Sequence, residues 1–413
     1  MSSTGSAISS DGIFSSLANR SYRLLWWSGL VAFLAVGMQL LARGWLAIQL
    51  TDSNTGFAIV LLCFGLGMFM VTPFGGVAAD RFSRRNLILG SHWSLFLSAL
   101  WLGLMVLLNL EQFWMLLVAS YIQGASFAFM GPARLAIVSE LVGPELVSNA
   151  ISLTQLTVSS TQTFGPALAG VLADVPSFGL AGVYLLSAAL TALSIIPVLM
   201  LPKGASQARH TASPLAEIAE GLAYVASQPF LRVLVLSTTL GLLMAMQYLA
   251  FLPKYSESVF GVGALWLGIL QGANALGGAC VALRVAKMRD NEKLERLRIS
   301  SLSVVVVGIA ALAVTPNQFV ALPVLFVLGG AATGFQTANL SLPLLLSEPV
   351  YHGRVQSLVM VALSSQALVA LPVGTLADQI GLREMHGLMA VGVVLVLAYS
   401  WFAGNAVRRK SYT

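Results

Sequence analysis

The sequence predicts an all-α polytopic membrane protein whose twelve transmembrane helices form two pseudo-symmetric six-helix bundles. Three observations support this fold class. First, 57% of the 413 residues are hydrophobic and only 9% are charged, whereas a soluble protein carries about 25% charged residues. Second, apolar windows of about 20 residues, long enough to cross a hydrocarbon core roughly 30 Å thick, recur along the chain. Third, short segments of the first half recur in the second half.

The expected helices are the windows with few or no charges. In chain order they cover residues 24–50, 56–79, 87–109, 113–136, 148–173, 180–201, 231–253, 262–286, 299–315, 318–346, 355–377 and 385–404. Pro323 and Pro343 predict that the tenth helix bends or breaks, because proline removes a backbone donor and clashes with the preceding turn. Cys63 and Cys280 fall inside these windows and are interpreted as apolar packing residues.

The remaining segments divide the chain at its polar stretches. The Ser/Gly-rich start lacks the basic-then-apolar layout of a secretory signal, so it is expected to be a cytoplasmic leader. An amphipathic stretch over residues 215–225 is expected to lie along the membrane face as part of a cytoplasmic linker. The expected division is leader 1–23, N-terminal bundle 24–202, linker 203–229, C-terminal bundle 230–404 and cytoplasmic tail 405–413.

Short repeats relate the two halves. The triplet "RLL" begins at Arg23 before the first helix and "RVL" begins at Arg232 before the seventh, while "SEL" around Glu140 and "SEP" around Glu348 follow the fourth and tenth helices. A shorter repeated segment lies at the ends of the second, fifth and eleventh expected helices: "GVAAD" over 76–80, "GVLAD" over 170–174 and "GTLAD" over 374–378. These offsets predict two homologous halves built from three-helix units.

The distribution of basic residues predicts the orientation. With both termini inside, the cytoplasmic segments hold all of the 22 Lys and Arg residues except Arg43, Lys254 and Arg383. This split follows the positive-inside rule, so a multi-pass protein of the cell (inner) membrane with cytoplasmic termini is expected. The net charge of +6 is explained by topology, and a nucleic-acid partner is not expected.

The charged corner after the second helix carries a family signature. "GGVAADRFSRR" resembles the motif Gly-x-x-x-Asp-Arg-x-x-Arg-Arg of the major facilitator superfamily, met here by Gly76, Asp80, Arg81, Arg84 and Arg85. The resemblance implies the major facilitator fold and a latch between the two halves in the outward-facing state. The alternative is that the arginines serve topology alone.

A second resemblance lies in the fifth helix. "GPALAG", with Gly165, Pro166 and Gly170, is similar to a glycine-proline motif of exporters and antiporters in this superfamily, although Ala169 stands where the motif has glycine. The segments "NRSYRLLW", "RGWLAIQLTDS" and "GPARLAIVSELV" resemble the subgroup of enterobactin and macrolide exporters. Many drug antiporters of the superfamily have arginine where this chain has Ser120. The helix 5 motif implies a biased transport cycle or, alternatively, a packing seam without directional meaning.

The family places helices 1, 4, 7 and 10 around a central cavity, and transporter sites lie near the midplane between repeats. The candidate cavity residues on those helices are Gln39, Arg43, Gln123, Gln247, Tyr248, Gln336 and Asn339. Arg43 stands out because a charge inside a span is expensive and marks a functional hypothesis. It is expected either to bind an anionic substrate group or to pair with Asp52, unless it snorkels to the outer interface.

These residues favour transport over catalysis. No Asp or Glu lies deep in a predicted span, and neither a converging His, Asp, Glu and Cys cluster nor a phosphate loop is present. No cofactor, metal site or enzyme activity is expected. The expected function is export of small amphipathic molecules, of drug or siderophore type, by a monomeric secondary transporter. Coupling to protons stays open, with Asp52, Asp174 and Asp378 as candidate carriers.

Two other interpretations remain open. The first is an importer, or a lipid or organic-anion facilitator, because one fold serves many substrates. The second is a polytopic membrane receptor or enzyme.

Overall fold

A computed structural model describes residues 14–142, 146–202, 214–285, 291–348 and 351–410. The first six long helices are α1 (Arg20–Thr51), α2 (Asn54–Arg81), α3 (Arg84–Leu107), α4 (Phe113–Val142), α5 (Val147–Ala173) and α6 (Gly179–Leu199). The next six are α8 (Pro229–Ala245) continued by α9 (Tyr248–Lys254) and a π-helical turn (Tyr255–Val259), then α10 (Ala264–Val285), α11 (Asn291–Val314), α12 (Gln318–Leu346), α13 (His352–Ile380) and α14 (Leu382–Lys410). A short 3₁₀ turn (Ser15–Ala18) precedes α1.

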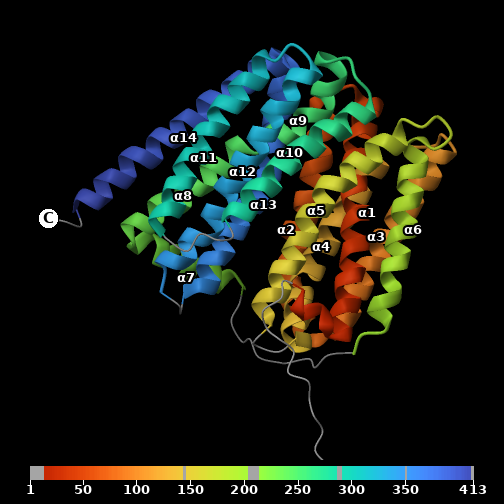
Figure 1. Cartoon of the computed structure of the whole chain (residues 1–413), viewed down its shortest axis with the longest axis horizontal. Coiled ribbons are helices and arrows are strands. Elements are labelled where there is room, and N and C mark those ends of the chain that lie inside the picture. The colour runs from red at the N-terminus through yellow and green to blue at the C-terminus, as the bar shows by residue number, and fades with distance from the viewer. Residues whose placement is uncertain (1–13, 143–145, 203–213, 286–290, 349–350, 411–413) are drawn as a thin grey trace, which may run out of the picture.

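These helices form two bundles with matching internal contacts (Figure 1). In the first bundle, which we call the N-bundle (α1–α6), the extensive contacts are α2 with α4, α3 with α6, and α1 with α5. In the C-bundle (α8–α14), the corresponding contacts are α10 with α12, α11 with α14, and α8 with α13. The two halves therefore repeat the same helix arrangement, as the sequence repeats predicted.

The helices are long and apolar enough to cross a membrane. Among the described residues, ten helical segments meet this condition by length and composition, with the α8–α9 segment and its π turn counted as one. Helices α5 and α13, of 27 and 29 residues, complete the two sets of six. The expected twelve-helix, two-bundle fold class is thereby confirmed.

Helix α12 does not break at its two prolines, and an interruption occurs elsewhere. Helix α12 runs unbroken from Gln318 to Leu346 with Pro323 and Pro343 inside it. Neighbouring helices allow transmembrane segments to hold proline without breaking. Instead, the seventh transmembrane segment is interrupted at Met246 and Gln247, between α8 and α9. Interrupted helices near the midplane are typical of transporter sites.

The bundles meet at one end of the molecule. We call this end, where α1 ends and α2 begins, the Asp52 end, and the opposite end, where α3 begins, the Arg84 end. Helix α5 packs on α10, and α2 packs on α13. In Figure 1 the bundles converge at the top, the Asp52 end, and diverge at the bottom, where α7 lies.

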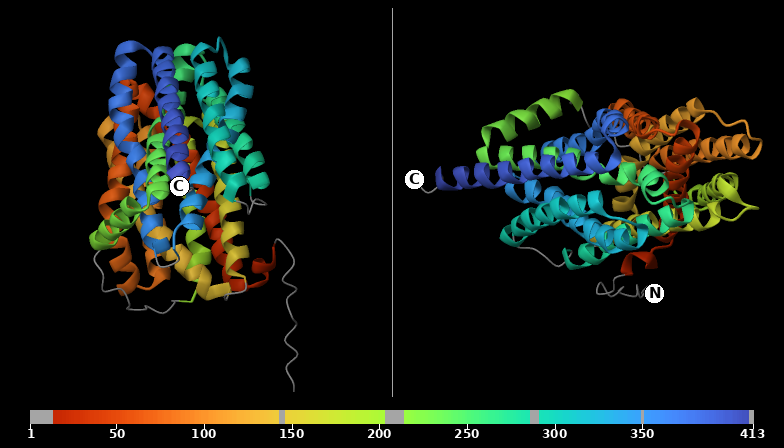
Figure 2. Two further views of the ribbon diagram at one scale, coloured as in Figure 1. Left: turned by 90° about the vertical axis from the view of Figure 1, so that its left-hand side faces the viewer. Right: turned by 90° about the horizontal axis from the view of Figure 1, so that it is seen from above.

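The linker contributes a helix that belongs with the C-bundle. Helix α7 (Pro214–Ser227) covers the expected amphipathic stretch and packs against α13 and α8, as the side view in Figure 2 shows. The Tyr224 ring stacks on Tyr351 with centroids 3.9 Å apart, and the Tyr224 hydroxyl accepts a hydrogen bond from the backbone N–H of Glu348. Val225 is buried in the same cluster. Movement of the C-bundle is therefore expected to carry α7 with it.

Candidate functional site: the interface between the bundles and its buried polar clusters

The closest approach between the bundles joins α5 to α10. A Cβ added at Gly170 would lie 2.6 Å from the carbonyl oxygen of Ala264 and 3.0 Å from the Cα of Gly268. A Cβ at Gly268 would lie 2.9 Å from the Pro166 carbonyl oxygen. Contacts this close exclude any larger side chain, so the two backbones touch. Two of the three helix 5 motif residues, Pro166 and Gly170, therefore lie on the interface between the bundles.

The third motif residue, Gly165, faces its own bundle. A Cβ at Gly165 would lie 2.9 Å from the Cα of Gly37 in α1. The motif thus lets α5 approach α1 on one side and α10 on the other. Small residues permit such close helix packing within membranes.

A second link between the bundles is a carboxylate that caps a helix across the interface. Asp378, near the end of α13, accepts hydrogen bonds from the backbone N–H groups of Asn54 and Thr55, both at 2.9 Å. It also accepts from the Ser53 and Thr55 hydroxyls, each at 2.5 Å, and from the Asn54 side-chain amide at 2.8 Å. These groups begin α2, where free N–H groups and the helix dipole favour an anion.

An ion pair forms the third link. Lys254 in α9 pairs with Asp52, which ends α1, and also with Glu257. The expected alternative in which Arg43 pairs with Asp52 is wrong, because Asp52 is mostly exposed and engaged with Lys254. Residue Asp52 has a left-handed backbone conformation (φ 48°) that ends α1 and turns the chain toward α2.

Three of the candidate cavity residues surround one point inside the N-bundle. Arg43 is only 6% exposed, so it does not snorkel to the interface. Its Nε donates to the Gln39 carbonyl oxygen and its Nη1 to the Ser120 hydroxyl, both at 3.3 Å. Its guanidinium lies over the Phe64 ring, 6.0 Å from the centroid. Gln123 is one turn from Ser120 on α4 and is equally buried.

The Arg43–Ser120 contact bears on the departure noted in the sequence. Ser120 stands where many drug antiporters of the superfamily have arginine. Here a guanidinium does reach that position, but it comes from α1. The sequence pattern alone gave no indication of this exchange between helices.

The C-bundle candidates lie around the interruption between α8 and α9. The Gln247 side-chain amide donates to the Gln366 carbonyl oxygen at 3.0 Å, and the Tyr248 hydroxyl donates to Asn274 Oδ1 at 2.7 Å. Both residues are buried. Interhelical hydrogen bonds thus hold Gln247, at the interruption, and Tyr248, which begins α9.

The two candidates on α12 have separate surroundings. Asn339 is buried, and its Oδ1 accepts from Thr238 at 2.8 Å. Gln336 is half-buried. No hydrogen bond or ion pair among the described side chains joins the N-bundle candidates to those of the C-bundle.

The signature corner lies at the Arg84 end. Arg84 pairs with Glu140, which ties the start of α3 to the end of α4 within the N-bundle. The Arg85 Nε is buried without a hydrogen-bond partner. The side chains of Gly76, Asp80 and Arg81 lie outside the described part of the chain.

Two further buried arginines were assigned from the sequence to cytoplasmic segments. Arg134 is 6% exposed in α4, donates to the Leu25 carbonyl oxygen at 2.8 Å and lies over the Phe33 ring. Arg298 is 2% exposed in α11 and pairs with Glu295. Both lie about two turns inside helix ends, where hydropathy windows do not separate a buried charge from a solvated one.

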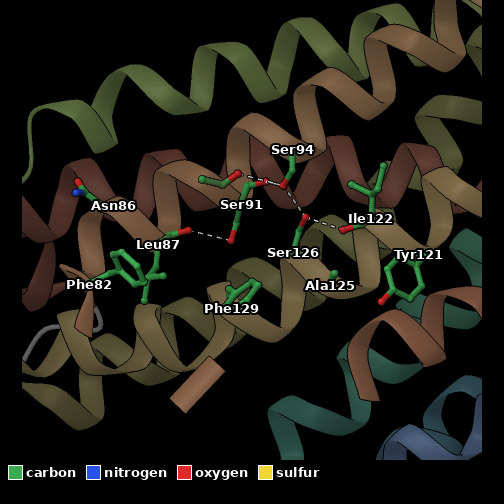
Figure 3. Close-up of a pocket in the computed structure, with 11 residues that line it drawn as sticks. Phe82, Asn86, Leu87, Ser91, Ser94, Tyr121, Ile122, Ala125, Ser126 and Phe129 are labelled. Carbon is green, nitrogen blue, oxygen red and sulfur yellow. Dashed lines mark hydrogen bonds between the residues drawn. The ribbon is translucent and has the colours of Figure 1, made fainter. Parts of the chain in front are cut away.

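The described surface also has a groove outside these clusters. It lies between α3 and α4, has a volume of about 440 Å³ and is lined mainly by apolar side chains such as Phe82, Ile122 and Phe129. Figure 3 shows that its serines hydrogen-bond to backbone carbonyls and to one another, with the Ser94 and Ser126 hydroxyls 2.7 Å apart. None of the candidate cavity residues lines it.

Comparison with known proteins identifies the family. The MFS family described as "Transmembrane secretion effector" matches residues 11–409. The enterobactin exporter EntS of Shigella flexneri is 29% identical over 59% of this chain and 57% of its own length. An uncharacterized MFS-type transporter, YfiS of Bacillus subtilis, is 27% identical over 45% of this chain and 44% of its own. The chain thus matches about half of the length of these curated relatives.

Solved structures share the fold. A bacterial homolog of the human lysosomal transporter Spinster, in an inward-facing and unoccupied conformation, aligns over 94% of this chain and 96% of its own, with a TM-score of 0.73 and 16% identity. A mutant of the nucleoside transporter NupG aligns over 94% and 98%, with a TM-score of 0.71 and 13% identity. The chain therefore belongs to the transmembrane secretion effector family of major facilitator superfamily transporters, which are integral membrane proteins and not enzymes.

Proposed function

We propose that the protein is a secondary transporter that exports small amphipathic organic molecules by alternating access. The observation that carries this proposal is the nature of the contacts between the bundles. Among the described side chains, the hydrogen bonds and ion pairs between the bundles lie at the Asp52 end. These polar links, together with the apolar and glycine contacts around them, can separate without unfolding either bundle, which supports rocking of the two bundles.

The direction of opening follows from the charge distribution. If the positive-inside rule holds, the Arg84 end faces the cytoplasm and both termini lie there. The described conformation is then inward-open, with the Asp52 end closed. The likeness to an inward-facing solved transporter supports this assignment. We propose that residues 24–202 and 230–404 form the moving units and that linker 203–229 joins them.

The charged signature segment between α2 and α3 is our candidate for closing the Arg84 end. We propose that Gly76, Asp80, Arg81, Arg84 and Arg85 latch the Arg84 end when the carrier faces outward. The Arg84–Glu140 pair supports this role because it holds the start of α3 against α4. Asp80 and Asp378 end repeated segments, and Asp378 caps α2 at the opposite end of the molecule. The two acids would then act in alternation.

Export is supported by two observations. The relatives include proteins named as enterobactin exporters, and the helix 5 motif lies at the interface between the bundles. An importer, or a lipid or organic-anion facilitator, is the alternative within the same fold. Proton coupling remains part of the proposal, with Asp52, Asp174 and Asp378 as candidate carriers. We propose a monomer in the inner membrane.

Flux measurements in proteoliposomes test the function. Purified protein is reconstituted, and uptake and efflux of a panel of amphipathic drugs and catecholate chelators are followed with and without a pH gradient. Gradient-driven movement of at least one compound supports a proton-coupled carrier, and gradient-independent movement removes the proton from the mechanism. If the protein moves no member of the panel down a concentration gradient, the exporter proposal is wrong.

A further inference from the structure

The N-bundle buries a cation for which the described residues supply no counter-charge. Arg43 lies within α1 and is 6% exposed. The acidic residues that the structure describes lie near helix ends, in α7 or in turns. Asp52 is about 13 Å further along α1, at 1.5 Å per residue, and pairs with Lys254. None of the described acidic residues pairs with Arg43, which points to a counter-charge from outside the chain.

The groups around Arg43 are neutral. Its two hydrogen bonds go to a backbone carbonyl of Gln39 and to the Ser120 hydroxyl. Burying an unpaired charge among neutral groups is costly, and the cost is larger in a membrane than near water. By contrast, Arg298 in the C-bundle is equally buried but has Glu295 beside it. Arg134 of the N-bundle also has no acidic partner among the described residues, so what distinguishes the Arg43 site is the set of unpartnered amide and hydroxyl groups on the neighbouring helix turns.

Further polar groups beside Arg43 have no partner. The side-chain amide nitrogens of Gln39 and Gln123 and the Tyr184 hydroxyl are buried and make no hydrogen bond. Gln39 is four residues from Arg43, and Gln123 is three residues from Ser120, so both share a helix face with the arginine site. Tyr184 of α6 is fully buried in the same cluster as Leu41 and Ala42, the α1 residues next to Arg43. Donors outnumber acceptors here, since Gln123 Oε1 is the one unpartnered carbonyl oxygen in this set and the two amide nitrogens carry two N–H groups each.

We propose that this donor cluster, formed by Gln39, Arg43, Ser120, Gln123 and Tyr184, binds an anionic group of the transported molecule, such as a carboxylate or a phenolate. The inference rests on the proposed carrier function and narrows its substrates to amphipathic acids. A guanidinium and several N–H and O–H donors match the oxygens of such a group. The cluster is buried in the described conformation, so its occupation is expected to depend on the state of the carrier.

Binding to the purified full-length protein tests the cluster without any need for transport. The thermal unfolding midpoint and the affinity are measured with 1-naphthoate, with its uncharged counterpart 1-naphthamide, and with sodium chloride. We expect 1-naphthoate to raise the midpoint of the wild type while 1-naphthamide does not. Arg43→Gln is expected to weaken 1-naphthoate binding at least about tenfold, the loss of one charged hydrogen bond, and Arg43→Lys by less.

Arg134→Gln is the matched control, because Arg134 is equally buried in the same bundle but lies outside the cluster. It is expected to keep the difference between the two naphthalene probes. Without added anion, Arg43→Gln is expected to unfold at no lower temperature than the wild type, because it removes an uncompensated charge. A lower midpoint for Arg43→Gln, together with no response of the wild type to any probe, overturns the proposal.

The remaining outcomes are also decisive. Equal shifts with 1-naphthoate and 1-naphthamide mean that the charge is not recognised, which overturns the proposal. Stabilisation by chloride that 1-naphthoate does not reproduce assigns the cluster to a structural counter-ion and overturns the substrate assignment. If 1-naphthoate binds through Arg43 but no compound is moved in proteoliposomes, the carrier function fails while the anion site stands.

Discussion

Removing the carboxylate of Asp378 is expected to release the Asp52 end. Asp378 caps the first turn of α2 with hydrogen bonds to the N–H groups of Asn54 and Thr55. Loss of a helix cap costs about 1 kcal/mol, and loss of a negative charge at a helix N-terminus costs about 0.3–1 kcal/mol. Because Asp378 is exposed to solvent, we take the lower part of this range, about 1.5 kcal/mol for Asp378→Ala.

This loss falls on one state of the carrier. The cap joins the two bundles, so it exists only while the Asp52 end is closed. A change of about 1.5 kcal/mol shifts the ratio of open to closed molecules about tenfold toward the form with an open Asp52 end.

Electron–electron distance measurements report this ratio. Spin labels are placed on cysteines introduced at Leu110 and Pro316, in exposed loops of the Asp52 end of each bundle, after Cys63 and Cys280 have been replaced. Asp378→Ala is expected to increase the long-distance population about tenfold relative to the short one. Asp174→Ala is the matched control: it ends the repeated segment "GVLAD", and its carboxylate accepts no hydrogen bond from the described residues. Identical distributions for Asp378→Ala and the unsubstituted background would refute the cap.

Three further substitutions test other contacts. Gly170→Val is expected to populate the open form more than Asp378→Ala does in the same distance measurement, because no side chain fits between α5 and α10; an unchanged distribution contradicts this. Lys254→Gln is expected to cost less than about 1 kcal/mol, because its acidic partner on α1 is 88% exposed, and an effect that survives high salt would argue against a screened pair. Glu295→Gln removes the acidic partner of buried Arg298 and is expected to lower the free energy of unfolding by about 3 kcal/mol in thermal unfolding. Glu292→Gln, from an exposed pair, is expected to change the free energy of unfolding by less than about 0.5 kcal/mol. Equal effects of the two substitutions would contradict the difference in burial.

The sequence predicted the positions of the transmembrane helices well because long apolar stretches alone mark the segments that can cross a membrane. The expected window 318–346 coincides with α12, and the others agree within a few residues except at the ends of α4 and α14, which run six residues further, and at α11, which begins at Asn291 and not near residue 299. Arg298 and Glu295 form an ion pair inside that helix. A window chosen for its low number of charged residues excludes such a pair and therefore begins too late. Pro323 and Pro343 do not break α12, because neighbouring helices allow a transmembrane helix to hold proline.

The contacts between the bundles could be predicted only in part from the sequence. The repeated "GTLAD" segment marked Asp378 as notable, but nothing in the sequence states that α13 lies beside α2, so its capping partners could not be named. The same holds for Asp52, whose partner Lys254 is about two hundred residues away in the chain. The interruption at Gln247 has no local signal of its own, because Pro253 follows it by more than a turn.

Closing the Asp52 end with a covalent bond tests the alternating-access account most directly. Ala167 and Gly272 face each other across the α5–α10 interface, and a Cβ at Gly272 would lie 3.6 Å from the Cβ of Ala167, within the range that a disulfide requires. In a background without Cys63 and Cys280, Ala167→Cys with Gly272→Cys is oxidised, and flux of a compound moved by the unsubstituted background is measured in proteoliposomes. We predict that oxidation stops the flux and that a reductant restores it, with each single cysteine variant unaffected. Undiminished flux through the fully cross-linked protein would contradict rocking of the two bundles.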